Sequence, residues 1–245
     1  MVKTIQKEGR KGLVVVALLV LLTAVAVFQF AASTPYGPTI DSATTEDPGT
    51  STSGTKLNHS KGKITTVKFN VTQPNQDWKG YVGNITGVLV LDDAANYTLY
   101  QWDLTTITGE VYATRNSGSI TWSNVDCANA THVSTEETAM GISSSEDDSI
   151  SNTFNNGNHP AFVVGTTSIA QNACNYSQYM YVNDAAQTTD FSEVLLSDGS
   201  YIIYTGILEN KTQGFDGKRY DFELILAENG DSSTNQAYYF YVELG

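Results

Sequence analysis

The stretch FSEVLLSDGSYIIYTGIL, residues 191–208, decides the fold class. Two apolar runs flank Asp198-Gly199, a dipeptide that readily adopts the positive φ angles of a tight two-residue turn. The stretch therefore predicts an antiparallel hairpin. Asn229-Gly230 lies in the same way between YDFELILA (220–227) and AYYFYVEL (237–244), and we interpret it as a second hairpin.

Short strands of this kind are expected along most of the chain. In residues 64–71, apolar Val67, Phe69 and Val71 alternate with polar residues, which is typical of a half-buried strand. Further strands are predicted at residues 81–91, 97–103, 107–115, 119–123, 161–165, 178–182, 191–196, 201–208, 219–227 and 236–244. So many short strands separated by turn residues predict a mainly β fold, an antiparallel β-sandwich or a jelly-roll-like domain.

Two short segments between residues 124 and 160 favour helices instead. Ser134-x-x-Glu137 and Ser145-x-x-Asp148 resemble capping boxes, in which a side chain satisfies the free amides at a helix start. The apolar end of the chain, residues 238–244, is a strand that we expect to pair inside the sheet as the last core strand. Exchange of this strand between subunits is the alternative.

The N-terminus predicts export. Residues 13–30 form an 18-residue apolar run, about 27 Å long as a helix, and Lys3, Lys7, Arg10 and Lys11 precede it. The basic side of such a segment stays in the cytoplasm, so the rest of the chain is expected outside the cell or on its surface. Three interpretations remain open: a signal peptide cleaved after small residues near Ser33, a prepilin-type signal cut at Lys11-Gly12, and a retained membrane anchor.

Composition divides the chain into three regions. We expect a signal, prepilin-type or anchor segment at residues 1–33 and a β-sandwich ectodomain at residues 63–245. The connecting residues 34–62 are rich in Ser, Thr, Pro and Gly, which is typical of a flexible linker or of an arm that orders on binding a neighbour.

Cysteines and sequons agree with export. Cys127 and Cys174 are the two cysteines of the chain, and an exported pair predicts one disulfide. Sequons for N-linked glycans occur at Asn58, Asn70, Asn84, Asn96, Asn129, Asn175 and Asn210.

The charge and the motifs limit the chemistry. The 245 residues contain 13 Lys and Arg against 26 Asp and Glu, so the net charge is −13 and nucleic acid is excluded as a partner. No GxSxG, HExxH or P-loop motif is present, so we expect no enzymatic activity and no cofactor.

A structural Ca²⁺ ion is the alternative to simple surface acidity, with oxygen ligands available at Glu146, Asp147, Asp148, Asp216 and Asp231. The large aromatic residues Trp78, Tyr81, Trp102, Tyr112 and Trp122 either fill the core or form a sugar-binding platform.

Several blocks carry a resemblance. The stretches DWKGYVGNITGVLVLDDAANYTLYQWDL (77–104), GEVYATR (109–115), ITWSNVDC (120–127), FSEVLLSDG (191–199), GFDGKRYDFELILAENG (214–230) and YYFYVEL (238–244) resemble a group of exported β-rich surface proteins from archaea and some bacteria. The resemblance implies export and a β-rich domain and implies no mechanism. In its apolar N-terminal segment, its Thr/Asn/Tyr-rich sandwich and its many sequons, the chain is also similar in style to pilin-like subunits of archaeal extracellular filaments.

These observations together predict a structural subunit of a glycosylated extracellular filament, with copies of itself as partners. Two modes of polymerisation are open. Residues 13–30 could pack as helices in a filament core, or residues 34–71 could add a strand to a neighbour's sheet, with Val67, Phe69 and Val71 setting the register. The alternative function is a membrane-anchored adhesin or glycan-binding domain.

Overall fold

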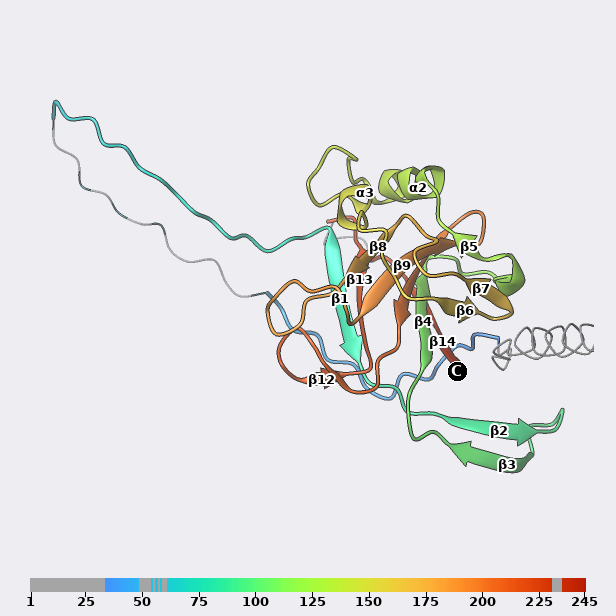
Figure 1. The fold of residues 1–245 in the computed structure, drawn as a ribbon. Coiled ribbons are helices and arrows are strands. Elements are labelled where there is room, and N and C mark those ends of the chain that lie inside the picture. Colours follow the sequence, from blue (N-terminus) through green and yellow to red (C-terminus); the bar gives the residue numbers. More distant parts are fainter. Residues whose placement is uncertain (1–33, 49–53, 55, 57, 59–60, 231–234) are drawn as a thin grey trace, which may run out of the picture. The chain divides into compact units, whose positions relative to one another are not determined.

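A six-stranded antiparallel sheet organises the fold (Figure 1). The computed structural model describes residues 34–48, 54, 56, 58, 61–230 and 235–245, all of them in the unit that spans residues 33–245. The sheet has the order β14-β4-β10-β9-β5, and β8 pairs with β9 as well. Its strands are β4 (Gly109–Thr114), β5 (Asp126–Cys127), β8 (Ser177–Tyr179), β9 (Ser192–Ser197), β10 (Ile202–Ile207) and β14 (Tyr239–Leu244).

The hairpin predicted at residues 191–208 is confirmed. Strands β9 and β10 are antiparallel, and Ile202 lies opposite Ser197. In the turn, the Asp198 carboxylate accepts hydrogen bonds from the amides of Ser200 and Tyr201, both at 2.9 Å. Gly199 has φ +96°, a conformation that L side chains rarely adopt, so this turn depends on a glycine there.

The two faces of the six-stranded sheet pack against different layers. Val111, Ala113 and Tyr204 belong to one face, which packs against a two-stranded sheet of β1 (Trp78–Gly83) and β13 (Phe222–Ala227) and against two helices. Tyr112 and Ile203 belong to the other face, which packs against the hairpin of β6 (Phe162–Val164) and β7 (Thr167–Ile169). The structure is therefore mainly β with antiparallel sheets, consistent with the predicted β-sandwich.

Smaller elements complete the described fold. They are the pairs β2 (Val88–Asp92) with β3 (Thr98–Asp103) and β11 (Thr212–Gln213) with β12 (Arg219–Tyr220), and the 3-10 helix η1 (Trp122–Asn124). The strand predicted at residues 119–123 was wrong, since η1 lies at its end. The strand predicted at residues 81–91 is interrupted, because β1 ends at Gly83 and β2 begins at Val88.

Two further strand predictions were wrong. Residues 64–71 belong to no strand and are exposed. The second hairpin does not form, because β13 pairs with β1 and β14 pairs with β4, so the strands on either side of Asn229-Gly230 lie in different sheets. Alternation of apolar residues indicates that a strand is half buried, and it does not identify the neighbouring strand. The expected pairing of the last strand inside the sheet is confirmed by β14.

Two helices form between residues 124 and 160 as expected, but other residues cap them. Helix α2 (Ala130–Met140) begins after Asn129, whose Oδ1 accepts the amides of Thr131 and His132 at 2.9 and 3.1 Å. Helix α3 (Ile150–Thr153) begins after Ser149, whose Oγ accepts the Asn152 amide at 3.2 Å. The two predicted caps were wrong. The hydroxyl of Ser134, for example, lies inside α2 and donates to the carbonyl of Thr131 at 3.1 Å.

The start of the predicted linker contacts the sheet edge. Tyr36 forms an isolated antiparallel bridge with Val242 of β14. The Tyr36 nitrogen lies 3.0 Å from the Val242 carbonyl oxygen, and the Val242 nitrogen lies 2.8 Å from the Tyr36 carbonyl oxygen. The bridge covers part of the outer edge of β14. The apolar run at residues 13–30 lies outside the described residues. Among the residues that the structure does describe, no helix is long and apolar enough to cross a membrane.

Candidate functional site

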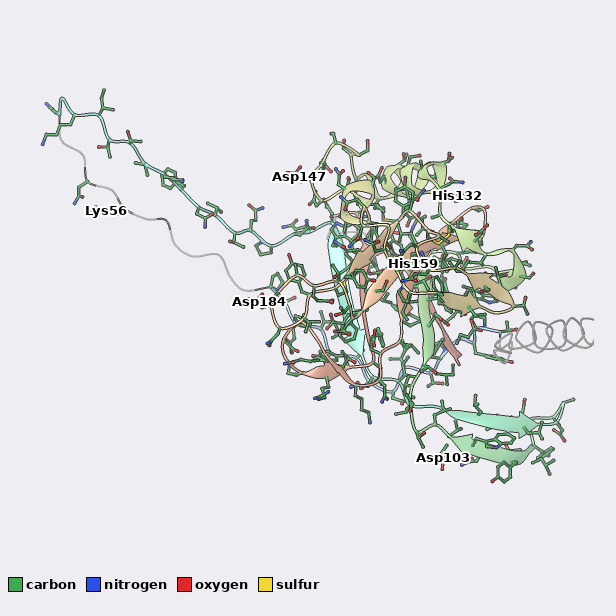
Figure 2. The ribbon with its side chains drawn as sticks, in the orientation of Figure 1. Lys56, Asp103, His132, Asp147, His159 and Asp184 are labelled. Carbon is green, nitrogen blue, oxygen red and sulfur yellow. A yellow bond between two sulfur atoms is a disulfide. The ribbon has the colours of Figure 1, made fainter. Side chains whose placement is uncertain are left out.

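The disulfide and the histidines have structural roles. Cys127 and Cys174 are bonded, with their Cα atoms 5.1 Å apart, which confirms the predicted disulfide. His159 is buried beside this bridge, and its Nε2 accepts the Cys174 amide at 2.9 Å (Figure 2). His132 accepts the Asn129 amide through Nδ1 in the capping box of α2, and His59 lies outside the described residues. Both described histidines therefore hold backbone in place.

The candidate Ca²⁺ ligands are only partly brought together. Oxygens of Glu146 and Asp148 lie within 4.8 Å of each other and of Asp77, a residue that sequence reasoning missed. Burial, followed by repulsion from Asp148 and Glu146, raises the pKa of Asp77. Asp147 is exposed and does not belong to this cluster. Carboxylate oxygens in such an arrangement are suitable ligands for a hard cation.

Other acidic candidates do not join the cluster. Asp216 pairs with Lys218, whose Nζ lies 2.6 Å from Oδ2. Asp231 lies outside the described residues. Glu136 accepts a bidentate hydrogen bond from Arg115 at 2.9 and 2.7 Å, so this carboxylate holds α2 to the end of β4.

All seven sequon asparagines are exposed. Asn96 lies in the turn between β2 and β3, with φ +62°. Asn84 and Asn210 line the same cavity of about 430 Å³, together with Arg219 and Asp221. Exposure makes these side chains accessible to a modifying enzyme.

The aromatic candidates divide between core and surface. Tyr112 and Trp122 are buried and their ring centroids lie 5.0 Å apart, while Trp78 and Tyr81 are half buried against the core. Trp102 differs, because it lies on β3 and is 49% exposed. Its ring forms an edge-to-face pair with Tyr100 at 4.9 Å. The core interpretation therefore holds for four of the five residues.

The hairpin of β2 and β3 is the most unusual surface of the described chain. Every residue of both strands is exposed, although most of their side chains are apolar. The register places Leu89 opposite Trp102 and Leu91 opposite Tyr100, so these four side chains share one face. An isolated two-stranded hairpin is marginally stable in water, and apolar patches exposed in this way mark interaction sites. We call this face, formed by Leu89, Leu91, Tyr100 and Trp102, the hairpin face.

Residues 64–71 form a second exposed apolar element. They are extended, and no backbone hydrogen bond joins them to another described segment. Val67, Phe69 and Val71 are 41%, 76% and 78% exposed. We call residues 64–71 the extended segment.

The two elements leave β1 at opposite ends. The extended segment leads into β1 at Trp78, and the hairpin follows β1 after Gly83 (Figure 1). Near Trp78 the chain is held by Asp148, which accepts Trp78 Nε1 through its carbonyl at 2.7 Å and the Asn75 side chain through its carboxylate. The base of the hairpin is held by buried Asp221, whose carboxylate accepts the amides of Ile85 and Lys211 at 2.8 Å.

Comparisons with known proteins do not extend this description. No protein-family model, no curated protein and no solved structure matches the chain.

Proposed function

We propose that this chain is the structural subunit of a glycosylated extracellular filament. The exposed extended segment carries the proposal, because Val67, Phe69 and Val71 present a strand-like apolar row whose backbone makes no hydrogen bond to the backbone of another described segment. Such a segment is suited to β-strand addition, in which main-chain hydrogen bonds provide affinity and alternate side chains provide register. A head-to-tail contact of this kind produces a fibre where successive copies do not close into a ring.

Further features support export and assembly. The apolar run at residues 13–30, the disulfide and the exposed sequons are expected of a cell-surface protein. The proposal includes an apolar helix over residues 13–30 and a jelly-roll-like arrangement of the strands. Packing of these helices between copies is the second mode of polymerisation. The proposal requires no cofactor, no nucleic acid and no catalytic activity, and a Ca²⁺ ion near Asp77 would have a structural role.

Electron microscopy of material sheared from cells that express the chain tests the proposal. We expect uniform filaments that contain this protein, and mass spectrometry of its N-terminus distinguishes the two modes. A start at Leu13 supports helix packing, and a start near Thr34 supports strand addition. Full-length chain in membranes without filaments would overturn the proposal.

A membrane-anchored adhesin or glycan-binding domain is the second candidate. The exposed pair of Tyr100 and Trp102 favours it, because such rings stack well on sugars. Binding of the full-length chain to a glycan array, lost on Trp102→Ala and retained on Trp78→Phe, would support this candidate.

A further inference from the structure

We propose that the extended segment of one copy pairs with the β2–β3 hairpin of the next copy, as a third strand. This inference rests on the proposed function and identifies the surface that receives the strand. Because one chain carries both elements, a second copy of this protein can supply the complementary half of the contact.

The hairpin lacks a third strand, and the extended segment can provide one. Two strands alone are marginal in water, whereas three strands with an apolar face gain independent stability. The hairpin face and the row of Val67, Phe69 and Val71 are both apolar and exposed. If the two elements pair so that both apolar rows lie on the same side, they form a three-stranded sheet with seven apolar side chains on one face.

Charge complementarity supports the pairing. Residues 61–71 contain Lys61, Lys63 and Lys68 and no acid, although the whole chain has a net charge of −13. The hairpin, residues 88–103, contains Asp92, Asp93 and Asp103 and no base. When the apolar rows share one face, Lys68 shares the other face with Asp103, and Figure 2 labels Asp103 on the hairpin.

The geometry favours pairing between copies over pairing within one chain. Asn75 is held at the Trp78 end of β1, and the four residue steps back to Val71 span at most about 14 Å. β1 itself is about 17 Å long, and the hairpin follows its other end. Residues 64–70 extend the reach of the segment beyond Val71, but among the described residues no backbone hydrogen bond joins it to the hairpin of its own chain. A donor and an acceptor at opposite ends of β1 instead make a heterologous contact that propagates from copy to copy.

Two complementary variants of the full-length chain test the proposal. The donor variant carries Val67→Ser, Phe69→Ser and Val71→Ser, and the acceptor variant carries Leu89→Ser and Leu91→Ser. Each variant retains the opposite half of the contact. We expect loss of filaments from cells that express either variant alone. When the two variants are co-expressed with different tags, we expect them to co-purify by affinity chromatography in detergent. Light scattering should then give the mass of a 1:1 complex.

Matched controls separate assembly from folding. Thr66→Ser with Gln101→Asn changes the opposite side of the same elements and should leave filaments intact. Because all substituted side chains are exposed, the melting temperature of each variant should equal that of the wild type. The proposal is overturned if the acceptor variant has the melting temperature of the wild type and still forms normal filaments. It is also overturned if the co-expressed donor and acceptor variants form no complex. Absence of filaments in the wild type would instead overturn the proposed function itself.

Discussion

Glu110 on β4 lies directly opposite Glu243 on β14, and both carboxyl side chains are buried. The carboxylate of Glu243 accepts hydrogen bonds from the Tyr112 hydroxyl and the Gly165 amide, both at 2.9 Å. Burial, followed by repulsion from Glu243, raises the pKa of Glu110 to about 8. The last strand of the sheet is therefore paired at a place where one carboxyl remains protonated at neutral pH.

This pair predicts a pH-dependent stability. Between the ordinary pKa of 4.5 and about 8, the folded chain binds more protons than the unfolded chain at Glu110. The free energy of unfolding should therefore fall as the pH rises through this range, by roughly 5 kcal/mol at most. Glu110→Gln should make this dependence less steep, which urea denaturation at pH 5, 7 and 9 measures. The exposed substitution Glu46→Gln is the control, and equal slopes in Glu110→Gln and the wild type would contradict the assignment.

The disulfide should contribute a large part of the stability. Cys127 and Cys174 are 47 positions apart, and in the chain-entropy model a crosslink over this length contributes about 4 kcal/mol. Cys127→Ser with Cys174→Ser should lower the free energy of unfolding by roughly this amount, as measured by urea denaturation. The reduced wild type is the matched control, since it should unfold at the same urea concentration as the double variant. A double variant as stable as the oxidised protein would show that the bridge contributes little.

The cap of α2 can be separated from the sequon at the same residue. Asn129 Oδ1 accepts two amides at the start of α2, so Asn129→Ala should cost about 1 kcal/mol. Asn129→Ser also removes the sequon but retains a capping oxygen, so its cost should be a few tenths of a kcal/mol. Thermal unfolding of both variants, produced in a host without N-glycosylation, makes the comparison. Equal losses in the two variants would mean that the cap is not the cause.

The acidic cluster should carry a repulsive cost. Since burial and the charges of Asp148 and Glu146 raise the pKa of Asp77, its charged form is unfavourable in the folded chain above the ordinary pKa of 3.8. Asp77→Asn should therefore raise the melting temperature at pH 7 in a buffer with EDTA, with an effect below about 1 kcal/mol because solvent screens the charges. Asp147→Asn, outside the cluster, should leave the melting temperature unchanged. A lower melting temperature for Asp77→Asn would show that the repulsion is compensated within the fold.

Local chemistry made parts of the fold predictable. The hairpin at residues 191–208 follows from its turn residues and the apolar runs on either side, which lie within a few positions of each other. The disulfide follows from the presence of just two cysteines in a chain whose N-terminal sequence predicts export. The helices were expected in the correct region, but their caps were wrong because Ser, Thr and Asn occur at many positions where they can cap.

Contacts between distant residues were beyond sequence reasoning. Asp77 joins Glu146 and Asp148 only because the chain before β1 lies beside the α2–α3 loop, about 70 positions further along. The pattern of residues 64–71 predicted a half-buried strand, yet no described partner lies beside it. An alternating segment needs a sheet edge before it becomes a strand, and its own sequence does not provide one.

The sequence by itself determined the fold class, the disulfide and the central hairpin. These depend on local periodicity, on the presence of only two cysteines and on the chemistry of the turn residues, respectively. Only the tertiary structure decided that β13 pairs with β1, that Glu110 faces Glu243, and that the β2–β3 hairpin is exposed. The physical reason is that strand pairing and burial depend on which segments meet in space, and similar apolar alternation occurs in many segments of this chain.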